Sequence, residues 1–222
     1  MRVVLTQWGI GVQPKRGSLA VSQPKQGSGL GAPLALLCLM TLGLSACANA
    51  PALTTYDLSG LNQVRRMPGL TLQLGIGEPS ASGLLDGDRI PIRTASGPVA
   101  YLPAVQWSER LPRLIQSSLI QSFELAHPRQ AVARIGDRMV ADVSLKGEIR
   151  HFEIDESSRE AVVELSMQIL REPDGRVIAG QIFAARLPLA SLESGPAMAG
   201  LDEAFKQVAQ KILIWVGREV HQ

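Results

Sequence analysis

The sequence predicts an α+β fold in which two helices pack on one face of an antiparallel sheet, in the order βββ-α-βββ-α. Apolar residues recur at spacings of three and four over 107–123 and 201–216, which is the period of an amphipathic helix. Apolar residues alternate over 139–154, 161–170 and 177–187, with short polar turns between, which is typical of an antiparallel meander. Two helices covering one face of such a sheet is the expected way to bury both apolar stripes.

Three shorter strands are expected before the first helix. Leucines alternate with polar or small residues over 70–74, as in a half-buried strand. Residues 88–93 and 99–102 are separated by the turn sequence of residues 96–98, which predicts a hairpin. Pro91 cannot donate a hydrogen bond to a neighbouring strand, so its strand is expected at an edge of the sheet.

The helices have predictable ends and a predictable buried face. Pro112 is tolerated only in the first turn of a helix, so the first helix is expected to begin near Leu111 and to end at His127-Pro128. Trp107 and Trp215 fall on the apolar stripes of the two helical segments, and we expect both to pack into the core.

A bacterial lipobox, Leu44-Ser45-Ala46-Cys47, ends an uncharged apolar run over residues 30–44. The run is shorter than the roughly 20 apolar residues of a membrane-spanning helix and suits the core of a secretory signal. Four basic residues and no acidic residue precede it. We therefore predict a lipoprotein signal peptide over residues 1–46.

Cys47 would then become the first residue of the mature protein and carry a diacylglycerol and an N-acyl chain. Residues 47–55 would form a lipidated tether, and residues 56–222 would form the folded domain. Two alternatives stay open at this point: an uncleaved membrane anchor, and an ordinary signal peptide cut at Ala46 or Ala48. The long basic region also leaves Val21 open as a start site.

Charge and cysteine content narrow the class of the mature protein. Without residues 1–46, the remaining 176 residues hold 18 basic and 20 acidic residues, a net charge of −2, which removes support for nucleic-acid binding. Cys38 would leave with the signal peptide and Cys47 would be acylated, so no thiol would remain for a disulfide, a metal or a nucleophile.

No catalytic or metal-binding pattern stands out in the sequence, so we expect a protein that is not an enzyme and has no cofactor beyond the lipid on Cys47. The three histidines lack metal-ligand spacing and are expected in loops or at the surface; they are His127, His151 and His221. The acidic cluster of Glu153, Asp155 and Glu156 is expected at a solvated hairpin tip, and residues 85–88 are expected to form a turn rather than a calcium loop.

Several short motifs occur in a familiar order after the lipobox. They are Tyr56-Asp57-Leu58, Leu84-Leu85-Asp86-Gly87-Asp88-Arg89-Ile90, Tyr101, Trp107 with Leu111-Pro112-Arg113-Leu114-Ile115, and Ile214-Trp215-Val216. In order and spacing, almost the whole mature chain resembles the ABC-type transport auxiliary lipoproteins of the paraquat-inducible protein C type. The chain departs from that family at Pro91-Ile92-Arg93, where members often have a tyrosine.

The resemblance implies a non-catalytic lipoprotein that accompanies an ABC ATPase, a permease and a mammalian-cell-entry (MCE) domain protein. Such systems move phospholipids or other apolar molecules between the inner and outer membranes. The residue after the cysteine is Ala48 rather than aspartate, which by the sorting rule for lipoproteins implies the periplasmic face of the outer membrane. Some members form rings, so the resemblance leaves a homo-oligomeric ring open.

Two other functions stay open. A structural or assembly lipoprotein of the cell envelope would share the lipobox and differ only in its partners, and a neighbouring gene for an MCE protein would separate it from the transport subunit. An envelope hydrolase would need a nucleophile and a base within hydrogen-bond reach.

Overall fold

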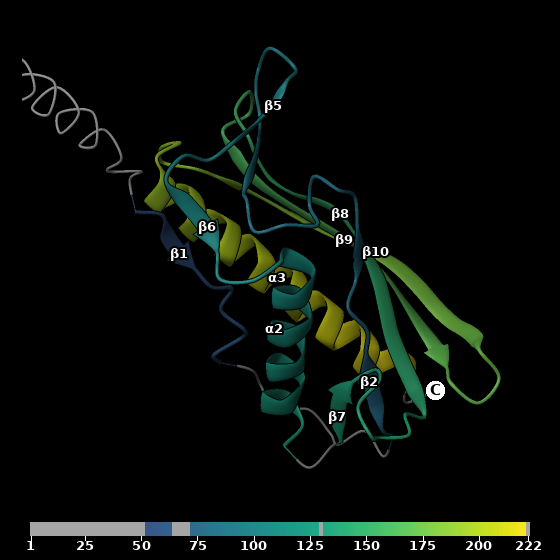
Figure 1. Cartoon of the computed structure of the whole chain (residues 1–222). Coiled ribbons are helices and arrows are strands. Elements are labelled where there is room, and N and C mark those ends of the chain that lie inside the picture. The colour runs from purple at the N-terminus through teal and green to yellow at the C-terminus, as the bar shows by residue number, and fades with distance from the viewer. Residues whose placement is uncertain (1–51, 64–71, 129–130, 221–222) are drawn as a thin grey trace, which may run out of the picture. The chain divides into compact units, whose positions relative to one another are not determined.

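The computed structural model describes residues 52–63, 72–128 and 131–220, which belong to a unit running from Ala50 to Gln222. Its framework is an antiparallel meander of three long strands, β8 (Val143–Asp155), β9 (Glu160–Arg171) and β10 (Arg176–Pro188) (Figure 1). The alternating sequence pattern predicted all three strands, and the structure confirms them.

The sheet is mixed, so the prediction of a purely antiparallel sheet is wrong. β2 (Leu74–Ile76), β3 (Ser80–Ala81) and β4 (Pro91–Arg93) pair in parallel with successive parts of β8, along the edge that β9 does not use. Parallel pairing requires a crossover connection, and the chain between β4 and β8 supplies one that contains a helix. Alternation in a sequence does not encode the direction of a strand, and strands of two or three residues are too short to show alternation.

Two further short strands complete the eight-stranded sheet. β5 (Val99–Tyr101) forms the predicted hairpin with β4, and β7 (Val132–Arg134) pairs in parallel with β2. β4 lies between β5 and β8, so the prediction that Pro91 marks an edge strand is wrong. Proline is tolerated there because it is the first residue of β4, and the pairing with β8 involves only Ile92 and Arg93.

A separate two-stranded sheet joins the start of the domain to its middle. β1 (Thr54–Tyr56) pairs in parallel with β6 (Val105–Trp107). Within the described residues, six strands precede the first helix and four follow it, so the order βββ-α-βββ-α is not confirmed. Trp107 lies on β6 and not on a helix, which corrects its predicted position, although it is buried as expected.

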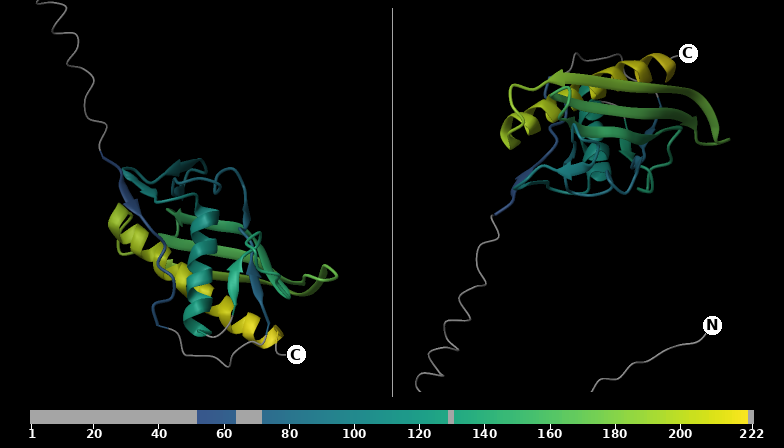
Figure 2. Two further views of the ribbon diagram at one scale, coloured as in Figure 1. Left: turned by 60° about the horizontal axis from the view of Figure 1, so that its bottom comes forward. Right: turned by 90° about the horizontal axis from the view of Figure 1, so that it is seen from above.

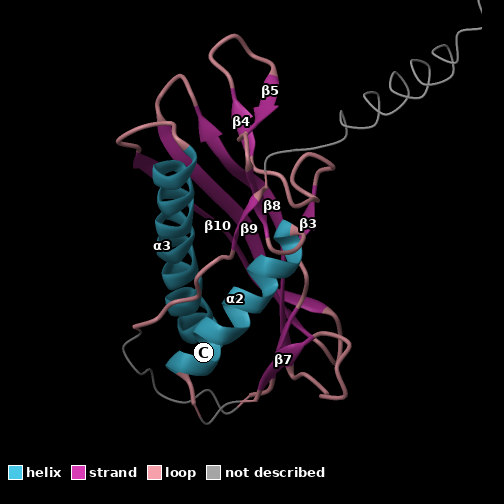
Figure 3. Ribbon diagram, turned by 60° about the vertical axis from the view of Figure 1, so that its left-hand side comes forward, coloured by secondary structure: helices cyan, strands magenta, loops and turns pink. Residues whose placement is uncertain are grey.

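Two helices cover one face of the large sheet. α2 (Leu111–Ala126) has Pro112 in its first turn and ends at His127, as predicted, and α3 (Ser194–Val220) lies along β9 and β10 (Figures 2 and 3). Each helix turns a stripe of apolar residues toward the sheet, because residues three and four apart lie on the same side of a helix.

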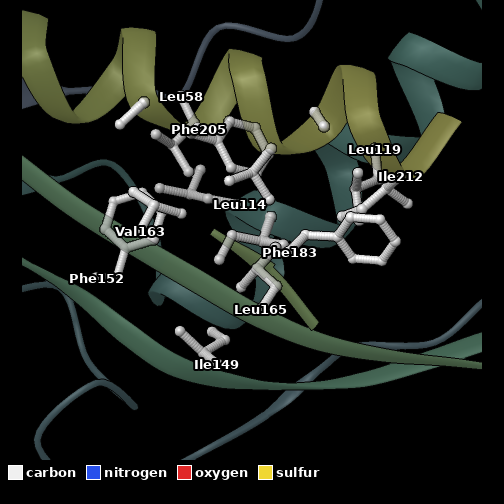
Figure 4. Close-up of a cluster of buried hydrophobic side chains, with 14 of the residues drawn as sticks. Leu58, Leu114, Leu119, Ile149, Phe152, Val163, Leu165, Phe183, Phe205 and Ile212 are labelled. Carbon is white, nitrogen blue, oxygen red and sulfur yellow. The ribbon is translucent and has the colours of Figure 1, made fainter. Parts of the chain in front are cut away.

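The core lies between the sheet and the helices (Figure 4). Phe152 of β8 is at its centre, with ring centroids 5.8 Å from Trp107 and 6.2 Å from Phe205 of α3. Val163 and Leu165 of β9 face the same layer, as Figure 4 shows. The sheet is therefore fixed to α3 by a contact between large aromatic side chains of β8 and the helix.

Candidate interaction surface

Cys47, the predicted lipid attachment residue, lies outside the described residues, as do the predicted signal peptide and His221. The first described strand, β1, begins at Thr54, so the end of the predicted tether is already paired with β6. Among the described residues, no helix is both long and apolar enough to cross a membrane.

The histidines and acidic residues singled out in the sequence have structural roles where the structure describes them. Within the described part of the chain, no three histidine, cysteine, aspartate or glutamate residues are grouped so that they could hold a metal ion. His127 follows the last residue of α2, outside the helix as expected, but it is buried rather than at the surface, and its ring stacks on Phe123 with centroids 6.5 Å apart. His151 is partly exposed on β8.

The prediction of a solvated hairpin tip holds for Glu156, which is exposed in the β8–β9 turn, but it is wrong for Glu153. Glu153 is buried and accepts hydrogen bonds from Nε and Nη2 of Arg93 at 3.0 and 2.8 Å, and it also lies 3.0 Å from Nδ1 of His151. Asp155 accepts hydrogen bonds from the turn residues Ser157 and Ser158. The cluster therefore fastens the β4–β5 hairpin and the β8–β9 turn. No sequence signal links Arg93 to Glu153, because the two residues lie on strands far apart in the chain.

The turn at residues 85–88 organises the start of α2. The guanidinium of Arg110, the residue before α2, contacts Glu78 at 3.1 Å and also pairs with Asp86. The carbonyl of Gly87 accepts a hydrogen bond from the first amide of the helix, that of Leu111. The Asp86 side chain and the Gly87 carbonyl of this turn thus both have structural partners, in agreement with the prediction of a turn.

The most distinctive surface is the outer edge of β10. β10 is the last strand of the sheet, and no described strand pairs with its outer side. Three large apolar side chains on it, Val177, Ile178 and Ile182, are exposed, and Ile182 has 49% of its surface accessible. Natural sheets usually shield such an edge with lysine, proline or a covering segment, because an open edge can pair with another chain.

A groove of about 410 Å³ follows this edge, between β10 and α3. We call it the β10–α3 groove. Its strand side consists of the consecutive residues 181–184, and its helix side consists of Lys211, Ile214, Trp215 and Arg218. Consecutive residues of a strand point to opposite faces, so a groove lined by four of them runs along the strand's edge and not over one face.

The floor of the groove is buried and apolar. Trp215 is only 4% exposed, which confirms its predicted burial, and its ring lies 5.3 Å from that of Phe183. Figure 4 shows Phe183 reaching from the sheet toward Ile212 of α3. Ile214, with 50% of its surface accessible, forms an exposed apolar wall.

The rim of the groove is basic. Lys211 and Arg218 lie two turns apart on α3, and no acidic residue lines the groove. Arg218 is paired with its neighbour Glu219 at 2.8 Å, whereas Nζ of Lys211 donates to the backbone carbonyl of Ala184 at 2.7 Å. That contact shows that the Ala184 carbonyl points outward. A strand residue directs its N–H and its C=O to the same side, and this side alternates along the chain, so Ile182 also presents its backbone groups outward.

A second depression, of about 480 Å³, lies at the other end of the sheet beside Arg134, Ile135, Val140 and Glu172. The pKa of the Glu172 carboxyl is lowered by the neighbouring Ser144 hydroxyl and by Lys146, whose ammonium lies 3.5 Å away. The polar residues that line this depression include Arg134 and Glu172. Arg134 belongs to β7, the terminal strand on this side of the sheet. The lining has mixed charge, whereas the β10–α3 groove is lined by two cations and no anion and is therefore the more specific binding surface.

Comparison with known proteins places the domain in a family. The profile of the family described as ABC-type transport auxiliary lipoprotein component matches residues 56–213, which include β10 and most of α3. The chain belongs to this family. The sequence resemblance stated above is thereby confirmed.

Individual relatives agree with that assignment. An uncharacterized protein, bll6063, of Bradyrhizobium diazoefficiens is 31% identical over 166 residues, which cover 72% of this chain and 44% of the relative. The chain thus matches less than half the length of that protein. The crystal structure of protein XCC0632 from Xanthomonas campestris, assigned to DUF330, has a TM-score of 0.68 at 27% identity and covers 76% of this chain and 98% of its own.

A further crystal structure, of an uncharacterized protein, has a TM-score of 0.60 at 14% identity and covers 75% of this chain and 99% of its own. At that identity the match concerns the fold alone.

Proposed function

We propose that the protein is a periplasmic lipoprotein anchored in the outer membrane, and that it serves as a non-catalytic auxiliary subunit of an ABC/MCE-type transport system. The system would move phospholipids or other apolar molecules between the inner and outer membranes. The observation that carries the proposal is the family match, which begins at residue 56, directly after the predicted lipobox and tether of residues 44–55.

Lipidation at Cys47 gives this proposal its physical basis. A single acyl chain binds a membrane only marginally, since each buried methylene contributes about 0.8 kcal/mol, but several chains on one residue give a durable anchor. The signal peptide of residues 1–46 would be removed, and the tether of residues 47–55 would lead to the domain. Ala48 in place of aspartate supports sorting to the outer membrane.

The proposed partners are an MCE-domain protein that spans the periplasm, together with its permease and ATPase. Within the described residues the polar clusters serve structural contacts, which supports a role as a binding subunit. A ring of several copies is compatible with this role. A structural or assembly lipoprotein without a transporter is the alternative, because it would need the same anchor and the same kind of domain.

The deciding experiment is affinity purification of the full-length tagged protein from detergent-solubilised envelopes, followed by mass spectrometry. A second lipoprotein of similar abundance, tagged in the same way, is the control for non-specific capture. Enrichment of an MCE-domain protein or its permease over the control is expected. If neither is enriched while known envelope complexes survive the same detergent, the structural alternative is favoured.

Membrane separation on a sucrose gradient tests the location independently. The protein should band with outer-membrane porins and should leave that fraction only when the membrane is dissolved. Banding with the inner membrane would contradict the proposed sorting and would leave the family assignment unchanged.

A further inference from the structure

We propose that the β10–α3 groove binds an extended peptide segment of a partner protein, which adds to the outer edge of β10 as a further strand. The segment would carry apolar side chains flanked by acidic ones. This inference does not depend on the transport proposal, because an assembly lipoprotein could use the same groove.

The first argument is the open edge of β10. Its 13 residues are mostly exposed, and Arg176 and Arg186 are its only charged residues. The interior of the strand therefore lacks the charges that usually prevent edge pairing, and it exposes Val177, Ile178 and Ile182 instead. An edge with these properties is either an aggregation hazard or a binding site, and a binding site explains the groove beside it.

The second argument is the geometry of the groove. The α3 residues that line it have the spacing of one helical stripe, and this stripe faces the edge residues 181–184. A strand added to β10 would turn every second side chain into the space against Ile214 and Trp215. This is the arrangement in which strand addition gains affinity from main-chain hydrogen bonds and specificity from alternate side chains.

The third argument is charge. The groove is lined by two cations and no anion, and the distance along α3 from Lys211 to Arg218 is about 10 Å. Two residues four apart on an extended strand are separated by about 13 Å, so acidic side chains at such positions could reach both cations. The position between them would then place an apolar side chain over Ile214.

On binding of the peptide, Lys211 would exchange its hydrogen bond to the Ala184 carbonyl for an ion pair with an acidic side chain. Its ammonium now donates to the outward carbonyl of Ala184 at 2.7 Å, a group that an added strand would need for its ladder. An amide of the incoming strand would replace the ammonium at that carbonyl. The released ammonium would then pair with the acidic side chain, so neither the Lys211 ammonium nor the Ala184 carbonyl would lose a partner.

The arginines of β10 itself argue against a second copy of this chain at the edge. Antiparallel pairing of two β10 strands about Gln181 would set Arg176 of each opposite Arg186 of the other, and like charges directly opposite each other destabilise a strand pair. The basic rim of the groove adds to this repulsion.

The test uses the full-length protein purified in detergent and a fluorescein-labelled nonapeptide, Thr-Val-Thr-Glu-Thr-Ile-Thr-Glu-Thr, in fluorescence anisotropy. Two control peptides carry lysine in place of both glutamates, or N-methyl groups on alternate amides. We expect the acidic peptide to bind and both controls to bind at least about tenfold more weakly, because one loses charge complementarity and the other its ladder hydrogen bonds.

Variants of the protein give the matching test. The double variant Lys211→Glu with Arg218→Glu should invert the preference, so that the lysine peptide binds more tightly than the acidic one. Arg113→Glu on α2 changes the charge of another helix and should leave both affinities unchanged. Ile182→Pro removes one outward amide and should weaken binding, while circular dichroism checks that each variant is folded.

Four outcomes would overturn the proposal. They are equal binding of the N-methylated peptide, absence of binding to folded protein, displacement of the peptide by phosphatidylglycerol vesicles but not by phosphatidylcholine vesicles, and an oligomer that Ile182→Pro dissociates. The third would assign the groove to an anionic lipid headgroup, and the fourth would assign the edge to a second copy of the chain.

Discussion

The guanidinium of Arg93 on β4 and the carboxylate of Glu153 on β8 form a two-point contact, with Nε and Nη2 at 3.0 and 2.8 Å from Oε1. The side chain of Glu153 is 5% exposed and that of Arg93 is 44% exposed. The pair fastens the β4–β5 hairpin to the sheet.

Arg93→Ala should destabilise the domain by about 2 kcal/mol, because it leaves the buried Glu153 carboxylate without its main partner. Arg113→Ala, which removes an exposed pair with Glu109, should cost less than about 1 kcal/mol. Urea denaturation of both variants measures the difference. Equal midpoints would mean that His151 and solvent compensate fully for the loss of Arg93.

Asp155 should contribute to the loss of stability in acid. Its pKa is lowered, chiefly because the Ser157 hydroxyl donates a hydrogen bond to the carboxylate and the Ser158 amide donates another. A group with a depressed pKa in the folded state stabilises the fold above its unfolded pKa of about 4 and loses this contribution as pH falls through the folded pKa.

Ser157→Ala should therefore raise the pKa of Asp155 toward its ordinary value, as measured by NMR titration of the carboxyl carbon. The dependence of stability on pH below about pH 4 should become shallower in the same variant. A titration curve identical to that of the unaltered protein would show that the Ser157 hydroxyl does not hold the carboxylate.

Gly147→Ala should destabilise the sheet. A Cβ at this position of β8 would lie 2.6 Å from the backbone carbonyl oxygen of Ser166 and would also collide with the sulfur of Met167. Gly180→Ala is the matched control, since a Cβ there would meet its nearest atom, in Gln168, at an ordinary 3.6 Å. Thermal unfolding should give a lower Tm for Gly147→Ala than for Gly180→Ala, and the reverse order would contradict the packing described for β8 and β9.

Trp215→Ala should cost about 3–5 kcal/mol, as truncation of a large buried aromatic residue usually does. The side chain packs on Phe183 and forms the floor of the β10–α3 groove. Ile214→Ala changes the exposed wall of the same groove and should cost far less. Denaturant unfolding separates the two, and an unchanged midpoint for Trp215→Ala would place this tryptophan at a surface rather than in the core.

Cys47→Ala should abolish lipidation and release a folded, soluble protein into the periplasm, with loss of function in the cell. Fractionation with osmotic shock, followed by immunoblotting, measures the release. If an exported but unlipidated protein restored full function, the proposed role of the anchor would be wrong.

Sequence periodicity predicted the elements that are long enough for their apolar residues to repeat over several helical turns or several strand alternations. α3 and the meander of β8, β9 and β10 belong to this group, because their apolar residues repeat often enough to define a face. α2 was found for the same reason, and Pro112 correctly placed its first turn.

The features that the sequence did not predict depend on contacts between distant segments. β2, β3 and β4 are too short to show a period, and their parallel direction follows from where the chain crosses back. Trp107 lies at a helical spacing from the apolar residues that follow it, but in the structure it belongs to β6. The sequence suggested that Glu153 is solvated, because its partner Arg93 lies on another strand and far away in the chain. The edge position of β10 likewise depends on which strands pair, which alternation does not encode.

The pairing of β1 with β6 has a mechanical consequence for a protein held by its first residue. If Cys47 is lipidated as proposed, any force between membrane and domain enters the fold at Thr54, whose amide donates to the carbonyl of Ala104 at 2.9 Å. The six residues from 48 to 53 can extend at most about 20 Å. Peeling away the three residues of β1 would lengthen this reach by about 10 Å without unfolding the core. β1 would thus act as an extensible joint between the membrane and the domain.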